Sequence, residues 1–294
     1  MAAAGRAVAF DLGFRQLDFG PSPIDADILL GSRMSIVSMR FSRAYHQLGE
    51  PPAGMRAFGL PIHGFRSWYG RDYDELSILP FNIPDWIDGV SEAGFEAFTL
   101  AIDGDYVEEV AASFQIPIAD ILMTPTSGAS IRNSESNQRL RRRLLNLTQD
   151  RDALLDGEHQ DEITAMLLHA SLSDGVIIGS SNPARRARAV SQALDYIGDN
   201  RGNAITVRGM CNAIGIPLRT INRAFRERFG IGPKAYLVRQ RLNSVRAELM
   251  HAPSDTLIAD IANHWGFWHM GQFAKDYKEM FGELPSETLS QSRA

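Results

Sequence analysis

This chain of 294 residues has a single cysteine, Cys211, and no long apolar stretch. One thiol excludes an internal disulfide and a thiolate-rich metal site. No segment approaches the roughly 18 apolar residues that a membrane-spanning helix requires. The apolar run at residues 7–10 is too short for a secretory signal peptide. We therefore expect a cytoplasmic protein that does not cross or bind a membrane.

Lysine is also scarce, and the charges are unevenly placed. All three lysines (Lys234, Lys275 and Lys278) lie in residues 185–294, where 16 Lys+Arg face 10 Asp+Glu and give a net charge of +6. Residues 1–184 carry 14 against 25, a net charge of −11. This asymmetry suits an acidic part that meets a small ligand or a protein and a basic part that meets phosphate. Ordinary scatter of charge is the alternative.

Short β-forming runs separated by glycine and proline characterise the first part of the chain. Residues 35–41 alternate in part, residues 95–100 follow a glycine turn, and residues 76–79 form another short run. Such punctuation is typical of a barrel or sandwich of short strands. Asp103 or Asp105 is expected to cap a short helix after these strands.

Helical periodicity begins after residue 134 and predicts two helices before a Gly- and Ser-rich linker at residues 175–183. The two helices either form a dimer interface or cover the sheet, and both interpretations stay open here. The expected fold class is α+β. We expect a β-rich domain with trailing helices over residues 1–180 and an all-α domain over residues 185–294.

Two stretches of the all-α domain repeat one pattern. Cys211 precedes Gly215 by the same spacing with which Ala262 precedes Gly266. A small residue lets two helices cross closely, and glycine tolerates the turn between them, which is the layout of a helix-turn-helix unit. Two copies on a basic segment predict a domain that binds double-stranded DNA.

The first unit is expected to begin with a helix capped by Thr206, followed by a reading helix that starts near Pro217. Ile221, Phe225 and Phe229 share the inner face of this reading helix. Its other faces carry four candidate DNA-binding residues: Arg219, Asn222, Arg223 and Arg226. Arginine suits guanine and asparagine suits adenine, whereas Arg226 suits a phosphate better than a base.

The second unit is expected to place its reading helix over residues 269–281, with Phe273, Tyr277 and Phe281 facing inward. Its outward candidates are His269, Met270, Gln272, Lys275 and Lys278. This helix carries few hydrogen-bonding side chains, so we expect phosphate contacts and apolar contact with thymine methyl groups.

A long helix over residues 233–251 separates the two units and should span roughly 28 Å. Successive major grooves on one side of B-DNA lie about 34 Å apart. A rigid spacer of this length can hold two reading helices in adjacent major grooves.

Several motifs of this domain stand together: GIGPKAY at 230–236, RLNSVRAEL at 241–249, Gly266-Phe267, Phe273 and FGELPS at 281–286. They strongly resemble the signature of the AraC/XylS family of bacterial transcription regulators. The stretch GFWHMGQF at 266–273 resembles the branch that contains the ethanolamine-utilisation operon regulator.

The resemblance implies a transcription regulator, here expected to be an activator that recruits RNA polymerase, with repression as the alternative that stays open. It implies that a monomer binds two major-groove sites through residues matching Arg219, Asn222 and Arg223, then Met270, Gln272, Ala274 and Lys275. Pro217 departs from the family pattern, which usually has a capping serine there. The resemblance further implies a cupin-like N-terminal domain that binds a small-molecule effector or mediates a homodimer contact.

An aromatic group in the β-rich part is the candidate effector pocket, comprising Trp68, Tyr69, Phe81 and Trp86. Aromatic surfaces near polar groups suit small ligands, although core or barrel-rim packing is the alternative. A regulator whose N-terminal domain binds a protein instead of a metabolite also stays open.

Catalytic and metal-binding patterns are missing. His46 and His63 stand apart, without a His-x-His motif or paired glutamates, so we expect no metal and no cofactor. Cys211 is interpreted as a small core residue and not as a nucleophile. We therefore expect no catalytic residue, and an enzyme with an appended DNA-binding module is the less favoured alternative.

Overall fold

A computed structural model describes the chain in the following ranges: 11–51, 53–69, 77–81, 87–119, 122, 129–131, 135–149, 156–173, 176–178, 184–200, 205–253 and 256–291. The chain divides into two compact units. The first comprises Met1–Phe14, Ile24–Ser42 and Gln47–Ser181, and the second comprises Arg15–Pro23, Arg43–His46 and Asn182–Ala294.

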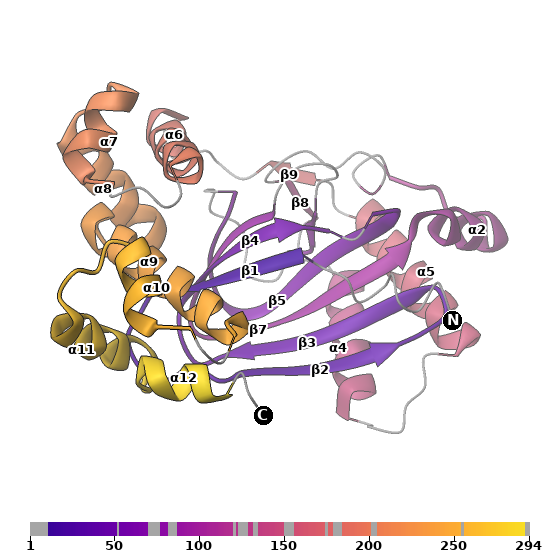
Figure 1. The fold of residues 1–294 in the computed structure, drawn as a ribbon. Helices are drawn as coiled ribbons and strands as arrows, with labels where there is room; N and C mark the ends of the chain where they lie inside the picture. Colours follow the sequence, from indigo (N-terminus) through magenta and orange to yellow (C-terminus); the bar gives the residue numbers. More distant parts are fainter. Residues whose placement is uncertain are drawn as a thin grey trace. The chain divides into compact units, whose positions relative to one another are not determined.

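The β-rich part forms a 7-stranded sheet with the path β1-β4-β7-β3-β2, and β5 pairs with β6 and β7 (Figure 1). The strands are β1 (Asp11–Gln16), β2 (Ile24–Leu30), β3 (Met34–Phe41), β4 (Tyr45–Glu50), β5 (Met55–Trp68), β6 (Leu79–Pro80) and β7 (Ile87–Asp103). β3 and β7 are antiparallel, with Met34 opposite Ile102 and Phe41 opposite Phe95. The predicted strand runs at 35–41 and 95–100 are confirmed, and β7 is much longer than its run.

One face of this sheet packs against helices α2 (Gly104–Phe114), α4 (Glu135–Gln149) and α5 (Gly157–Ser173). Sheet residues such as Ile36 and Leu100 share a buried cluster with Leu144 of α4 and Leu167 of α5. The interpretation that the trailing helices cover the sheet is therefore confirmed. The cap of α2 is Asp103, whose side chain accepts a hydrogen bond from the backbone of Tyr106.

The expected linker at 175–183 is in part a strand. β9 (Val176–Ile178) pairs antiparallel with β8 (Ala129–Ile131), and Ile131 also bridges Ile78. The segment predicted as a linker therefore contains a short strand. The pairing joins segments far apart in sequence, so no local pattern could indicate it.

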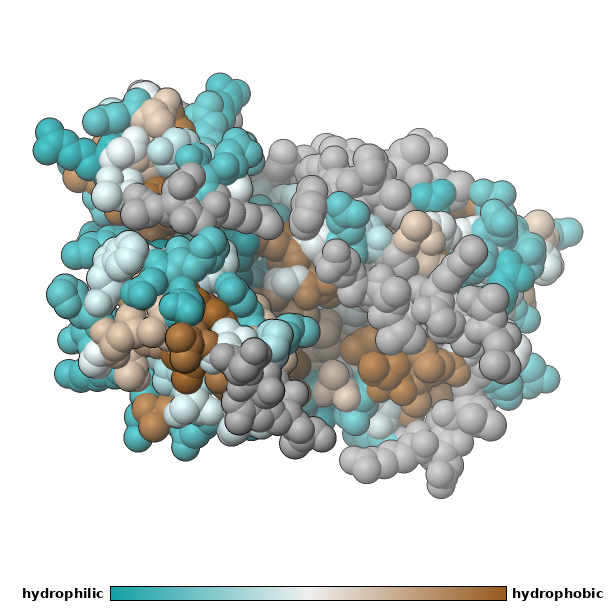
Figure 2. Space-filling model, viewed as in Figure 1, coloured by the Kyte–Doolittle hydropathy of each residue, from teal (hydrophilic) through white to brown (hydrophobic). Residues whose placement is uncertain are grey.

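Strand β2 ends the strand order and carries apolar side chains on its exposed face. Ile24, Ile28 and Leu30 are 42%, 48% and 48% exposed, and they alternate along the strand. Figure 2 shows hydrophobic residues gathered over the region of β2 and β3. An exposed apolar edge strand is unusual for a sheet that has no further partner, because its free backbone groups can pair with another chain.

The second unit is helical, apart from its two short N-terminal segments. Its helices are α6 (Ala184–Asp199), α7 (Val207–Ile214), α8 (Leu218–Phe229), α9 (Pro233–His251), α10 (Ile258–His264), α11 (Met270–Phe281) and α12 (Pro285–Gln291). Val245 of α9 and Tyr277 of α11 are fully buried in one cluster, to which α12 contributes Leu289. The α+β fold class, with a helical C-terminal part containing two helix-turn-helix units, is confirmed.

Segment Arg15–Pro23 belongs to the second unit, although no motif in this segment predicts that placement. Gln16 is 2% exposed, and its Nε2 lies 2.8 Å from the carbonyl oxygen of Met280, at the end of α11. The backbone N–H of Gln16 donates to Oδ1 of Asn243 on α9 at 3.0 Å. Segment Arg43–His46 belongs here too, since His46 Nδ1 lies 2.8 Å from the hydroxyl of Tyr236.

Replacing Gln16 by alanine should weaken the packing of α11. The Gln16 amide contacts the carbonyl oxygens of Asp18, Gly20 and Met280, and these buried acceptors would lose a donor. We expect a loss of about 1–3 kcal/mol in the opening free energy of the amides in α11, measured by native-state hydrogen exchange of the full chain. Gln291→Ala, at an exposed position of α12, is the control that should leave those amides unchanged. Equal protection in both variants would show that the Gln16 contacts do not stabilise α11.

Candidate nucleic-acid interface

Capping residues mark where the helices of the first helix-turn-helix unit begin and end. Thr206 Oγ1 accepts a hydrogen bond from the backbone N–H of Gly209 at 3.0 Å and begins α7, as predicted. Gly215 ends α7 with a φ of 68°, a left-handed conformation that glycine adopts without steric cost. Pro217 is the N-cap of α8 and makes no side-chain cap hydrogen bond. Its ring instead fixes φ near the helical value.

The inner face of α8 is fully packed. Ile221 and Phe225 are both 0% exposed, and Phe229 is 3% exposed, which confirms the predicted core positions. The Phe225 ring contacts Phe229 at 5.3 Å and Tyr236 of α9 at 5.4 Å between centroids. Because this face is held by buried aromatic contacts, the opposite face of α8 has a fixed direction.

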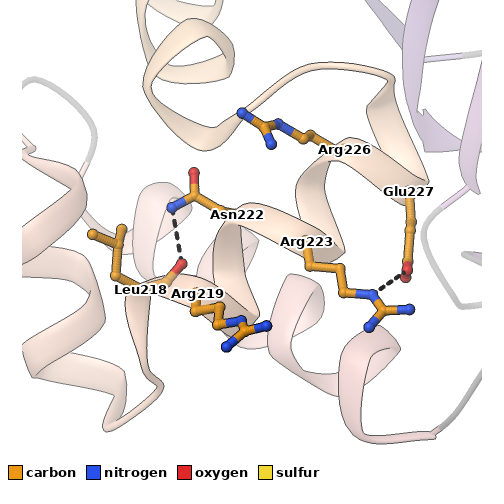
Figure 3. A pocket seen from close by; sticks show the side chains of 6 residues that line it. All are labelled: Leu218, Arg219, Asn222, Arg223, Arg226 and Glu227. Atoms are coloured by element: carbon orange, nitrogen blue, oxygen red, sulfur yellow. Dashed lines mark hydrogen bonds and ion pairs between the residues drawn. The ribbon is translucent and has the colours of Figure 1, made fainter.

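That opposite face is a basic surface hollow of about 600 Å³ on α8 (Figure 3). The residues that line it are Leu218, Arg219, Asn222, Arg223, Arg226 and Glu227. The structure thus brings together all four candidates predicted on this helix and adds Glu227, which the sequence analysis missed. The spacing of four residues between Arg223 and Glu227 was the available signal, because residues four apart meet on a helix surface.

Two of these side chains already have partners within the protein. Nδ2 of Asn222 donates to the backbone oxygen of Leu218 at 3.0 Å, and Nε of Arg223 donates to Oε1 of Glu227 at 2.9 Å (Figure 3). Oε2 of Glu227 in turn pairs with Nε of Arg186 on α6 at 2.7 Å. Arg223 therefore keeps its outer nitrogens for a ligand, whereas Asn222 must break a hydrogen bond to use its amide.

The second unit turns at Gly266, which has a φ of 79°, and continues into α11 after His269. Phe273 and Tyr277 are 2% and 0% exposed, and Phe281 is 5% exposed, so the predicted core face is confirmed. Burial raises the pKa of Tyr277 to about 12, and its hydroxyl lies 2.8 Å from Oγ1 of Thr288. Tyr277 is therefore a neutral core residue at any physiological pH.

Most of the candidate DNA-binding residues at α11 are exposed, but one packs in part against the core. His269, Gln272, Lys275 and Lys278 are exposed, and Ala274 is partly exposed. Met270 packs in part against the core cluster of the unit. Nε2 of Gln272 donates to Oδ1 of Asp276 at 2.6 Å.

The sequences of the two reading helices can be aligned at their C-cap glycines. Gly230 and Gly282 are left-handed C-caps that donate to the carbonyl oxygens of Arg226 and Lys278, respectively. Counted back from these caps, the outward positions correspond pairwise: Arg219 with Gly271, Asn222 with Ala274, Arg223 with Lys275, Arg226 with Lys278, and Glu227 with Glu279. Arg223 and Arg226 are thus matched by lysines in α11, whereas Arg219 and Asn222 are matched by Gly and Ala.

Helix α8 is also more positively charged than α11. The sequence of α8, LRTINRAFRERF, has four arginines and one glutamate. That of α11, MGQFAKDYKEMF, has two lysines balanced by one aspartate and one glutamate. The attraction for phosphate is therefore concentrated on α8.

Helix α9 joins the two units and comprises 19 residues, with the predicted bounds. Tyr236 near its start and Leu249 near its end are both buried, so both ends of the helix contribute to packing. At 1.5 Å per residue it spans roughly 28 Å.

Three of the four candidate effector residues lie together in the first unit. The Trp68 ring lies 4.9 Å from Tyr69 and 5.1 Å from Phe81, measured between centroids. Tyr69 has a positive φ of 49°, which is uncommon for an aromatic residue. Trp86 lies outside the described residues. Trp68 is 2% exposed, and its Nε1 has no hydrogen-bond partner in the part of the chain that the structure describes.

Among the described residues, no group of three or more His, Cys, Asp or Glu side chains could hold a metal ion. Cys211 is buried, and burial raises the pKa of its thiol. A neutral, buried thiol is a poor nucleophile. Within the described ranges there is also no helix with both the length and the apolar character needed to span a lipid bilayer.

The helical part of this chain matches a known family model. A family model described as a helix-turn-helix domain matches residues 210–291. The probable thc operon regulatory protein of Rhodococcus erythropolis is 34% identical over 101 residues, which are 34% of this chain and 30% of that protein. XylDLEGF operon transcriptional activator 2 of Pseudomonas putida is 30% identical over 140 residues, which are 46% of this chain and 86% of that protein.

For other curated relatives, the chain spans less than half of their length, between 30% and 42%. Among solved structures, the AraC-like transcriptional activator CuxR is similar at a TM-score of 0.37 and 13% identity, over 84% of this chain and 89% of that one.

Paired helix-turn-helix units with a basic outward face define a DNA-binding protein. The chain belongs to the AraC/XylS family of transcriptional regulators. This family consists of transcriptional regulators, which confirms the expectation that the chain is not an enzyme.

Proposed function

We propose that this protein is a sequence-specific transcriptional activator that inserts α8 and α11 into two adjacent major grooves of DNA. The observation that carries the proposal is the outward row of exposed Arg219, Arg223 and Arg226 with partly exposed Asn222, on a helix whose inner face is fully buried. Such a helix presents base-reading and phosphate-binding groups in a fixed direction. Similar proteins are named as transcriptional activators in Pseudomonas putida and Yersinia pestis, which supports activation over repression.

The side chains differ in their proposed roles. Arg219 and Arg223 have the geometry to read guanine, and Asn222 can read adenine once it releases the Leu218 carbonyl. Arg226 at the end of α8 is assigned to a phosphate. On α11, Met270 and Ala274 are assigned to thymine methyl groups and Gln272 to a base edge. The phosphate contacts of this helix are assigned to His269, Lys275 and Lys278.

The test of this proposal is selection of duplexes from a random pool by the full chain, followed by gel-shift titration of the winning duplex. We expect a common motif in two parts about one helical turn apart. The specific affinity should exceed that for random duplex by at least 10³-fold. Failure of the folded chain to enrich any sequence would refute the proposal.

Replacing Lys278 by alanine should weaken binding to every duplex by a similar factor. A phosphate contact carries no sequence information, and its loss should lower the slope of log Kd against log salt by about one. Gel-shift titrations at several salt concentrations measure this slope. Arg139→Ala, an exposed cation on α4, is the control expected to leave it unchanged. An unaltered slope in Lys278→Ala would place this lysine outside the interface.

We further propose that a small effector binds the first unit near Trp68, Tyr69 and Phe81. The buried Trp68 N–H supports this, because an unpaired buried donor is costly unless a ligand supplies an acceptor. Native mass spectrometry of the full chain after dialysis against cell extract would detect such a ligand. Capture of a protein instead of a metabolite would favour the alternative in which this unit binds a protein partner.

The remaining partners follow from the proposed activity. RNA polymerase is the expected partner at the promoter. A cytoplasmic location suits a protein that binds both DNA and this polymerase. A homodimer through the exposed β2 edge is proposed from its apolar residues, and sedimentation of the full chain tests it.

We propose residues 185–294 as the core of the DNA-binding domain, supplemented by segments Arg15–Pro23 and Arg43–His46. The likeness to the ethanolamine-utilisation branch rests on residues 266–273 alone.

A further inference from the structure

We infer that Glu227 is a positioning residue that makes Arg223 selective for guanine. This inference rests on the proposed function, because it assumes that α8 enters a major groove. The acidic side chain of Glu227 lines the same hollow as the arginines that should attract phosphate (Figure 3). A carboxylate there weakens binding to any DNA, so it must be explained by another role.

Glu227 does not stabilise α8 as a helix. It lies in the last turn, where the carbonyl end of the helix dipole disfavours a negative charge. Its partner Arg223 precedes it by four residues, and the favourable orientation of such a pair has the acid first. The Arg223 side chain is 68% exposed, and exposed ion pairs of this kind contribute little to folding. Helix stability therefore gives no reason for this glutamate.

The geometry instead restrains the Arg223 guanidinium. Glu227 accepts the hydrogen bond of Nε at 2.9 Å, which leaves both terminal nitrogens of Arg223 unused by that contact. Guanine is read by two parallel hydrogen bonds from such nitrogens to its O6 and N7 atoms. A long, exposed arginine otherwise loses rotamer freedom on binding, and it can also turn toward a phosphate. Fixing Nε removes part of that entropic cost and selects the base-reading direction.

Glu227 is itself held by a second cation. Its Oε2 pairs with Nε of Arg186 at 2.7 Å, and the Arg186 side chain is only 24% exposed. The carboxylate thus links α6 to the reading face of α8. Two ligands on two different oxygens fix the plane of the carboxylate more firmly than one would.

The second reading helix provides a matched control. Glu279 occupies the position of Glu227 on α11, and Lys275 occupies that of Arg223. Glu279 is exposed, and in the described part of the chain it forms no ion pair with Lys275. Glu279→Gln therefore makes the same change of charge at the same helical position without releasing a reading side chain.

The experiment compares Glu227→Gln, Glu227→Ala and Glu279→Gln in the full chain. The probes are the selected duplex, the same duplex with the Arg223-dependent guanine replaced by adenine, and random duplex. We expect Glu227→Ala to reduce the guanine preference by about threefold or more and to strengthen binding to random duplex by about twofold. Glu227→Gln keeps an acceptor oxygen and should lose less preference. Glu279→Gln should strengthen binding to random duplex by a similar factor but leave the preference for guanine unchanged.

A double-mutant cycle completes the test. If Glu227 acts through Arg223, Glu227→Ala should cost no further guanine preference in an Arg223→Ala background. Unchanged preference in Glu227→Ala, an equal fall on all three duplexes, or additive losses in the cycle would each overturn the inference. If the wild-type chain selects no sequence at all, the proposed function fails instead. Thermal unfolding of each variant identifies a change in folding, and Glu227→Gln gives the answer if Glu227→Ala does not fold.

Discussion

Arg223→Ala should lower the affinity of the full chain for its selected duplex by about 1–3 kcal/mol, or roughly 5- to 150-fold. Affinity for random duplex should fall much less. The reason is that Arg223 is exposed on the outward face of α8 and already shares its charge with Glu227, so its value as a phosphate contact is reduced. Gel-shift titration against duplexes with each base pair changed in turn should show relaxed preference at one position.

Arg223→Lys is the informative companion to this variant. It keeps the positive charge but replaces the planar fork by an ammonium, which cannot make the same paired contact with guanine. Its random binding should stay near that of the wild type, while its preference falls at the same base pair. If both variants lose affinity for selected and random duplex by one common factor, Arg223 is a phosphate contact and not a reader.

Phe225→Ala should destabilise the first helix-turn-helix unit by about 3–5 kcal/mol. Phe225 is 0% exposed and contacts Phe229 and Tyr236, so truncation leaves a cavity between α8 and α9. The chain has two units, and a single unfolding midpoint would mix their contributions. Native-state hydrogen exchange resolves the effect, which should appear as faster exchange of the amides in α7, α8 and the start of α9.

Phe114→Ala is the matched control, because Phe114 is 53% exposed at the end of α2. It should change the free energy of unfolding by less than about 0.5 kcal/mol. Specific DNA binding should weaken in Phe225→Ala and stay unchanged in Phe114→Ala. Retention of wild-type exchange in α8 after the loss of Phe225 would contradict the packing that directs this helix.

The helical unit was the most predictable part of the fold, since several of its boundaries have a local cause. Thr206 begins α7, Gly215 ends it, and Gly232-Pro233 begins α9 at the predicted residue. The inner face of α8 followed from periodicity, because buried aromatic residues recur every fourth position. The start of α11 was displaced by one residue, with His269 as its N-cap, since no strong capping residue marks this position.

Features made by contacts distant in sequence could not be predicted. Gln16 contacts Met280, and His46 contacts Tyr236, but neither N-terminal segment carries a motif that names its partner. The pairing of β8 with β9 replaced part of an expected linker for the same reason. The role of Glu227 was also missed. Its spacing from Arg223 was visible, but its second partner, Arg186, comes from another helix.

The measurement that tests the central claim most directly is interference mapping of the complex between the full chain and its selected duplex. Methylation of guanine N7 blocks the major groove, and uracil in place of thymine removes a major-groove methyl group. Guanine interference should mark the half-site of α8, and uracil interference should mark a second half-site about ten base pairs away on the same face. Interference confined to one half-site, or to adenine N3 in the minor groove, would contradict insertion of both reading helices.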